Sequence, residues 1–219
     1  MLGVSRLNAK HEKGDTLIEV LFAVTVFSFI VVSALSIMNQ GLATSQRALE
    51  ITLVRQQMDA QAETLRFLHD SYVQAYQSGT TAYEAGTPAA EYNELIQYIK
   101  GGDPVSARTA ASQFGGVGPC VVPNNASTDF ILNPIAATYM SNDMKTGVFT
   151  NATTFAQLTY TSGNEINHSE GIWIEAVRSD TGGTNAGSID FHIRACWAAP
   201  GLDMPMNLGT IVRLYEPRG

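Results

Sequence analysis

The sequence is poor in the residues on which catalysis and metal binding usually depend. Its 219 residues include two cysteines and four histidines. No H-x-x-H, H-E-x-x-H or C-x-x-C spacing occurs, and G-x-S-x-G turns and glycine-rich phosphate loops are absent. Residues 162–170 and 178–185 collect oxygen ligands, but neither stretch has the ligand spacing of a calcium loop. We therefore expect no enzymatic activity, no catalytic residues, no cofactor and no metal site.

Positive charge is also scarce. The chain has 13 Lys and Arg residues against 20 Asp and Glu residues, a net charge of −7. Three of the basic residues but only one acidic residue precede Asp15, so residues 15–219 carry a net charge of −9. Nucleic-acid-binding proteins usually display a basic patch, and none is evident after the N-terminus. We therefore expect no direct nucleic-acid partner.

Charge is missing altogether from Val20 to Met38, and proline is missing from the whole chain before Pro88. As a helix, these 19 uncharged residues would span roughly 28 Å, close to the ~30 Å hydrocarbon thickness of a membrane. The segment therefore predicts a transmembrane helix. It includes small hydroxyl residues of the kind found at helix–helix contacts in membranes: Thr25, Ser28, Ser33 and Ser36.

Three interpretations of this span differ in what happens at its N-terminal end. The basic residues Arg6, Lys10 and Lys13 precede it, which keeps the N-terminus in the cytoplasm. A secretory signal peptide would need a shorter apolar core and a small-residue cleavage site, whereas the helical pattern here runs on. A plain single-span anchor explains the length and the orientation of the span. It leaves the carboxylate of Glu19 unexplained at the edge of the lipid.

Cleavage before the span would supply a partner for that carboxylate. A cut after Gly14 would leave a new ammonium group on Asp15, four residues from Glu19. In an assembly, the amine of one chain could then neutralise Glu19 of the next chain within the lipid. Buried charges are tolerated when they are paired.

Residues 11–29, HEKGDTLIEVLFAVTVFSF, resemble the class III signal of type IV pilins and pseudopilins. That signal is a short basic leader ending in Gly, then a mature N-terminus, Thr-Leu-Ile-Glu and a long apolar helix. The resemblance implies that a prepilin peptidase cuts between Gly14 and Asp15 and N-methylates Asp15. It also implies that Glu19, the fifth mature residue, sets the register of assembly. The mature chain would start with Asp15 where the family usually has Phe.

The same resemblance implies where the protein is found and what it meets. The precursor would be a single-pass protein of the cytoplasmic membrane with its N-terminus inside, and the assembled form a cell-surface filament. Its partners would be the prepilin peptidase, the inner-membrane assembly platform and other pilin subunits, which it contacts through the N-terminal helix. The resemblance covers residues 1 to about 60 and does not extend by motif into the rest of the chain.

The helical pattern continues past the membrane segment to Gln77. Beyond residue 50, apolar residues recur at steps of three or four, so one side of the helix must pack on something globular. Sustained heptads are missing, which disfavours a coiled-coil stalk. We expect an α+β, pilin-like fold with a long helix over residues 15–77 and a small antiparallel β-sheet. The predicted stripe comprises Ile51, Val54, Met58, Ala62, Leu65, Leu68, Tyr72 and Tyr76, widened by Leu42, Leu49 and Leu53.

The rest of the chain divides into two regions. Residues 78–168 are rich in turn residues and predict a variable, loop-rich region with a helix at 91–102 and a strand within 128–134. Residues 169–219 alternate apolar and polar residues between Gly, Asp, Asn and Pro turns. This pattern predicts three strands in an antiparallel meander, one face of which lies on the helix stripe.

The two cysteines, Cys120 and Cys196, leave two interpretations open. Outside the cytoplasm they would form a disulfide, which would close a loop of about 76 residues and stabilise the fold by roughly 4 kcal/mol. Inside the cytoplasm they would be two free buried thiols. Alternation along the last strands places Cys196 on the sheet face of Asp190, His192 and Arg194, so a bridge would pin the variable region across the sheet.

The sequence favours a structural subunit, minor or at the tip, of a type IV pilus or related filament. One alternative is a pseudopilin of a type II secretion or DNA-uptake system. Another is a membrane-anchored surface binding protein that never polymerises. Aromatic residues of the polar middle region, Tyr139, Phe149, Phe155 and Tyr160, are expected in the domain core rather than on an adhesive or DNA-stacking surface.

Overall fold

The computed structural model describes residues 15–80, 82–101, 120, 122–123, 129–179 and 187–217. Two compact units are present, Met1–Gln46 and Arg47–Gly219. The predicted leader, residues 1–14, lies outside the described residues.

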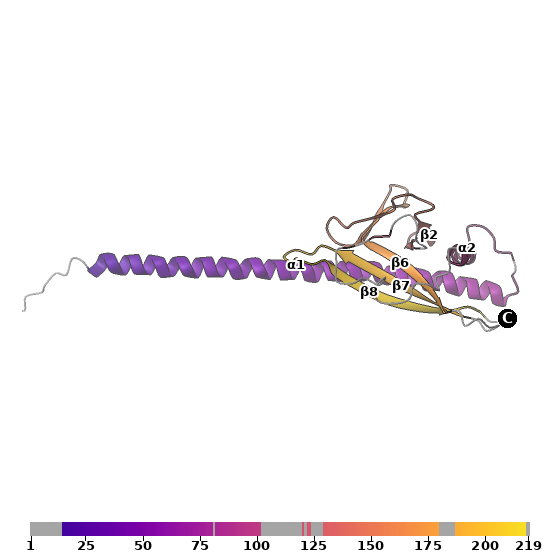
Figure 1. The fold of residues 1–219 in the computed structure, drawn as a ribbon, viewed down its shortest axis with the longest axis horizontal. Coiled ribbons are helices and arrows are strands. Elements are labelled where there is room, and N and C mark those ends of the chain that lie inside the picture. The colour runs from indigo at the N-terminus through magenta and orange to yellow at the C-terminus, as the bar shows by residue number, and fades with distance from the viewer. Residues whose placement is uncertain are drawn as a thin grey trace, which may run out of the picture. The chain divides into compact units, whose positions relative to one another are not determined.

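Helix α1 (Asp15–Gln77) contributes residues to both units (Figure 1). It confirms the predicted long N-terminal helix. Gly41 lies inside it without interrupting it, because a single glycine costs a helix only about 1 kcal/mol relative to alanine and no proline follows until Pro88. Within residues 17–46, every side chain is exposed except that of Ala43, which is half-buried.

One side of α1 packs into the hydrophobic core of the second unit, as the apolar periodicity predicts. The opposite side is polar, and there Arg66 and Glu63 lie 2.6 Å apart and exposed. Ile51 and Tyr72 pack half-buried against the core. The fully packed residues of this helix are at most 5% exposed: Val54, Met58, Ala62, Leu65 and Leu68.

Two leucines assigned to the stripe from the sequence lie outside the core. Leu42 and Leu49 are 56% and 60% exposed, so the prediction for both residues is wrong. Leu42 belongs to the first unit. Leu49 precedes Met58 by nine residues, and nine steps of about 100° place it roughly on the opposite side of the helix. Leu53 is half-buried.

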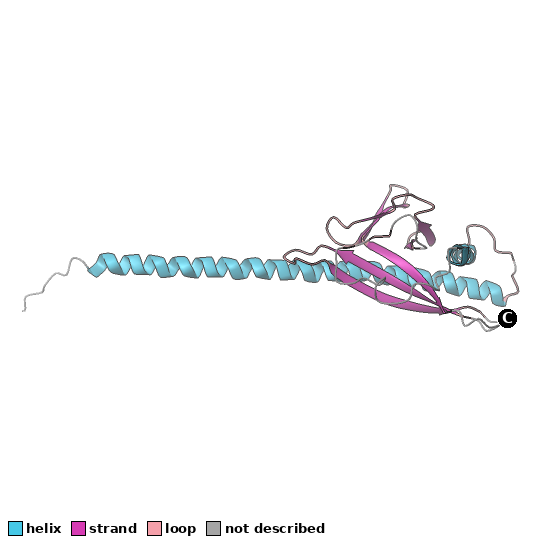
Figure 2. Cartoon of the chain, viewed as in Figure 1, coloured by secondary structure: helices cyan, strands magenta, loops and turns pink. Residues whose placement is uncertain are grey.

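Five antiparallel strands form the main sheet of the second unit, in the order β2-β1-β6-β7-β8. Strands β6 (Ile172–Ser179), β7 (Ser188–Trp197) and β8 (Met206–Tyr215) pair in sequence order and confirm the predicted meander (Figure 2). Their alternate apolar residues join the core around α1. The indole of Trp197 donates a hydrogen bond to Glu50 on α1 (2.9 Å), which fixes the end of β7 against the helix.

Strands β1 (Phe130–Asn133) and β2 (Thr138–Ser141) extend this sheet beyond the meander. β1 confirms the strand predicted within residues 128–134. It pairs with β2 along its whole length, whereas its pairing with β6 is limited to Phe130 opposite Ile174.

A second sheet of three short strands was not individually foreseen from the sequence. Its order is β3-β5-β4, with β3 (Phe149–Thr150) parallel and β4 (Gln157–Tyr160) antiparallel to β5 (Ile166–Glu170). The apolar alternation of these strands is too short to distinguish them from loop. The aromatic residues of the middle region confirm the core prediction, since Phe149 is buried and Tyr139, Phe155 and Tyr160 pack half-buried against the core.

Helix α2 (Pro88–Gly101) starts three residues before the predicted helix at 91–102. The Thr87 hydroxyl accepts a hydrogen bond from the backbone N–H of Ala90 (3.3 Å), so Thr87 caps the helix. Pro88 takes the first helical position, where a missing N–H costs nothing. The helix buries one side in the core through Tyr92, Leu95, Ile96 and Ile99.

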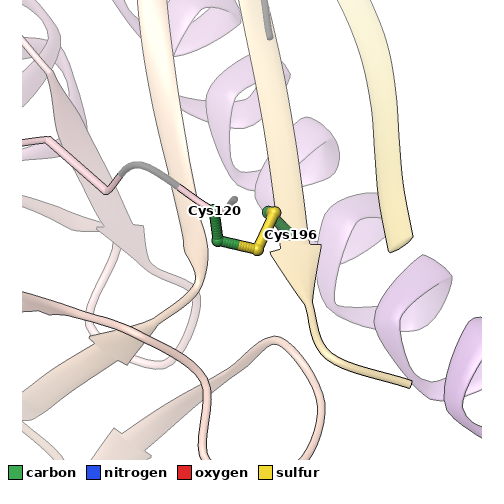
Figure 3. Close-up of a disulfide and its surroundings, with 2 residues drawn as sticks. All are labelled: Cys120 and Cys196. Carbon is green, nitrogen blue, oxygen red and sulfur yellow. A yellow bond between two sulfur atoms is a disulfide. The ribbon is translucent and has the colours of Figure 1, made fainter. Parts of the chain in front are cut away.

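Cys120 and Cys196 form a disulfide with a Cα–Cα distance of 5.7 Å (Figure 3). This confirms the disulfide interpretation over the free-thiol one. Cys196 is buried near the end of β7, and Cys120 is half-buried. The bond therefore fastens the chain at Cys120 to the main sheet, as the alternation along β7 predicts.

Candidate functional site

The exposed apolar surface of α1 in the first unit is the leading candidate for the functional site. The helix is long and apolar enough to cross a membrane, with a mean hydropathy of 2.6 over its most apolar 18 residues. None of those residues is buried within the chain. Large side chains such as Phe22, Phe29 and Ile37 are 70–75% exposed. A surface of this kind is stable when lipid or other apolar helices cover it.

Three hydroxyl groups in this segment are satisfied within the helix itself. The side chains of Thr25, Ser28 and Ser33 donate hydrogen bonds of 2.7–2.8 Å to carbonyl oxygens three or four residues earlier. An unsatisfied hydroxyl would be costly in hydrocarbon, and back-bonding to the helix removes that cost. The segment can therefore enter lipid despite its polar residues.

Glu19 is the one charged residue of α1 from Thr16 to Gln46. It is exposed and is the fifth residue of the helix. Residues 20–46 contain no Asp, Glu, Lys or Arg, so that stretch offers no cation to pair with Glu19. A carboxylate placed in lipid needs such a partner. Asp15 is the first residue of α1, and Gly14 lies outside the described residues.

A polar cluster lies on the sheet face that carries Asp190, His192 and Arg194. Asp190 accepts two hydrogen bonds of 2.6 Å from Arg213 on the neighbouring strand. This pairing with the Arg213 guanidinium lowers the pKa of the Asp190 carboxyl. Burial, with a smaller contribution from Arg194, lowers the pKa of His192. The cluster consists of paired charges, which favours a role in holding the strands together.

Glu175 on β6 is the part of this face that sequence reasoning missed. The alternation assigns Trp173 and Glu175 to a mixed or polar face, yet they are 7% and 5% exposed. The indole of Trp173 donates a hydrogen bond to Glu175 (2.8 Å), and the Arg194 guanidinium lies 3.2 Å from the same carboxylate. Glu175 is therefore a buried ion-pair member, which alternation alone could not reveal.

Metal binding finds no support in the described part of the chain. Among those residues, no three His, Cys, Asp or Glu side chains gather closely enough to hold a metal ion. Of the two oxygen-rich stretches, 162–170 forms β5 and the turn before it. Most of 178–185 lies outside the described residues.

No family model, curated protein or solved structure matches the chain. A family proposal therefore rests on the resemblance of the N-terminal part of the chain, which the motif in residues 11–29 carries.

Proposed function

We propose that the protein is a structural subunit, minor or at the tip, of a type IV pilus or related pilus-like filament. A prepilin peptidase would cut the precursor after Gly14, and α1 would hold the processed subunit in the cytoplasmic membrane until assembly. The observation that carries this proposal is the position of Glu19, an exposed carboxylate near the start of an apolar helix surface that has no other charge from Thr16 to Gln46.

The physical role of Glu19 follows from the cost of charge in lipid. A carboxylate at the centre of a span costs about 2.5–3.5 kcal/mol on insertion scales, and less near an end. The α-amine freed on Asp15 of an adjoining subunit would offset that cost by pairing with Glu19. Because the charges pair in one relative position of the two helices, the pair would fix the register while apolar helix packing supplies cohesion.

Two other assignments share this N-terminal chemistry. A pseudopilin of a secretion or DNA-uptake system would use the same cleavage and the same helix packing. A surface binding protein that never polymerises is favoured by the fact that one exposed apolar helix is enough for an anchor. Mechanical shearing of cells separates these cases, because a filament subunit leaves with the filaments and an anchored monomer stays with the membrane.

Mass spectrometry of the N-terminus of the native protein tests the proposal directly. We expect a chain that begins at Asp15, with or without one N-methyl group. A protein recovered with its leader intact from Met1 would have no amine next to Glu19, and the proposal would fail.

A further inference from the structure

A small pocket of about 160 Å³ in the second unit is lined by three tyrosines and one carboxylate. Tyr72 and Tyr76 lie one turn apart on α1, Tyr92 belongs to α2, and Glu216 follows β8. Three segments that are distant in the sequence therefore meet at this pocket. It is smaller than the ~300–1,000 Å³ of pockets that take drug-sized ligands.

The rings around Tyr72 form one continuous aromatic group. The ring centroid of Tyr72 lies 5.3 Å from those of Tyr83 and Tyr92, and 6.5 Å from that of Tyr76. Tyr92 is buried, whereas Tyr72 and Tyr76 are half-buried and reach the pocket opening. The rings of His69 and Tyr92 also form a T-shaped pair, with their centroids 5.3 Å apart. The pocket is thus lined by aromatic rings, and the faces of such rings carry negative partial charge.

Glu216 is held at the pocket by its own backbone and by that of its neighbour. Its N–H donates a hydrogen bond to the Gly187 carbonyl (3.0 Å), and the Tyr215 carbonyl lies 3.0 Å from Nε2 of His69. Burial and the charge of Glu216 both raise the pKa of Tyr92. Burial, Tyr83 and the charge of Glu216 raise the pKa of Tyr72 to about 12. Tyr72 and Tyr92 are therefore neutral at physiological pH, beside a carboxylate.

We propose that this pocket binds a small organic ammonium cation of the trimethylammonium type, such as choline. A quaternary ammonium group is attracted by the faces of tyrosine rings and by a nearby carboxylate, and it needs no hydrogen-bond acceptor. An anion would find no basic side chain among the residues that line the pocket. A metal ion would find one carboxylate and otherwise aromatic or apolar walls. Binding at this pocket would hold whether or not the chain assembles into filaments.

The test uses the full chain in maltoside micelles, since a phosphocholine detergent would occupy the proposed site. Choline is titrated and its N-methyl protons are followed by NMR. We expect saturable binding with a Kd on the order of 1 mM and an upfield shift of the methyl signal in the bound state. The uncharged isostere 3,3-dimethylbutan-1-ol should bind about 5-fold more weakly or worse.

Variants of the pocket separate ligand binding from a purely structural role of the tyrosines. Tyr76→Leu should weaken choline binding about 5-fold, whereas Tyr76→Phe keeps the ring and should bind like the wild type. Glu216→Gln should also weaken binding about 5-fold or more. Asp59→Asn is the matched control, because Asp59 is an exposed carboxylate on the same helix that does not line the pocket. Near-UV circular dichroism checks that each variant is folded.

Two sources of the ligand are distinguished by comparing choline with phosphocholine. Tighter binding of phosphocholine would identify a phosphocholine headgroup as the source, and tighter binding of choline a free cation. The proposal would be overturned by the lack of saturable choline binding, by equal binding of the uncharged isostere, or by equal losses in Tyr76→Leu and Tyr76→Phe.

Discussion

The side-chain amide of Gln61 binds both backbone polar groups of Leu132. Its Nε2 donates to the Leu132 carbonyl (2.8 Å), and the Leu132 N–H donates to its Oε1 (2.9 Å). Gln61 is fully buried on α1, and Leu132 lies in β1. Because β1 pairs with β6 through Phe130 alone, the Gln61 amide takes the place of further strand pairing there. A helix side chain thus completes the hydrogen bonding of the sheet.

Replacement of Gln61 with alanine should therefore be costly. Gln61→Ala leaves a buried N–H and a buried carbonyl of Leu132 without partners, and we expect a loss of about 2–4 kcal/mol in the free energy of unfolding. Gln56→Ala, at an exposed position of the same helix, should change it by less than about 0.5 kcal/mol. Urea denaturation of both variants measures the difference. Equal stabilities would show that water replaces the amide at no cost.

Gly171 should not tolerate a side chain. Its φ is +66°, and an added Cβ would lie 2.3 Å from the Cys196 carbonyl oxygen. Gly171 also joins the two sheets, since its N–H donates to Thr150 and its carbonyl accepts from Cys196. We expect Gly171→Ala to lower the free energy of unfolding by more than about 2 kcal/mol.

The control for this substitution is Gly163→Ala. The nearest atom to a Cβ added at Gly163 is 3.8 Å away and its φ is not in the left-handed region, so alanine should fit there. Thermal unfolding of both variants, followed by near-UV circular dichroism, compares them. A Gly171→Ala protein as stable as Gly163→Ala would mean that the junction of the sheets is free to shift.

The pair of Asp190 and Arg213 should make stability depend on pH at the acid end. Arg213 lowers the pKa of Asp190 in the folded protein, so the Asp190 carboxyl contributes stability above its unfolded pKa of 3.8. That contribution is lost as the pH falls through the lower folded-state pKa. At pH 7, Asp190→Asn should lower the Tm by about 1–3 °C, because the pair is partly exposed and screened by solvent.

Thermal unfolding at several pH values checks this prediction. The difference in Tm between the wild type and Asp190→Asn should stay constant above about pH 5 and shrink below 3.8. A Tm difference that persists unchanged at pH 2 would mean that it arises from the hydrogen-bonding geometry of the side chain and not from its charge.

Glu19→Ala tests the proposed register of assembly. The variant should insert into the membrane, because alanine makes the helix more apolar, and it should still be cut after Gly14, because the cleavage site is unchanged. It should nevertheless be missing from sheared filaments. Glu63→Ala removes an exposed carboxylate in the second unit and should assemble normally. Immunoblots of the sheared and membrane fractions give the readout. Filaments that contain Glu19→Ala at wild-type levels would disprove the register role.

The elements with long periodic patterns were predictable from the sequence. The helix to Gln77 and the three strands of the meander each repeat their apolar spacing often enough to be recognised. Two cysteines allow one pairing, but the sequence left open whether Cys120 and Cys196 are bridged, because that depends on the compartment. Steps of three or four residues do not identify Leu49 as exposed, whereas its helical angle to Met58 does.

The remaining features depend on contacts between distant segments, which spacing does not encode. Strands β3, β4 and β5 form a sheet only through mutual pairing. The burial of Gln61 depends on β1, 71 residues away. Tyr72 and Tyr76 were recognised as part of the helix stripe, but nothing in the sequence places Tyr92 and Glu216 beside them. The function of Glu19 stays a prediction.

The disulfide between Cys120 and Cys196 indicates the compartment in which the second unit completes its folding. Thiols stay reduced in the cytosol and are oxidised beyond the cell membrane. If α1 anchors the chain as proposed, the second unit would be synthesised open and locked only after export. The oxidation state of Cys120 and Cys196 would then distinguish subunits that have been translocated from those that have not. Only the oxidised subunits would be ready to assemble.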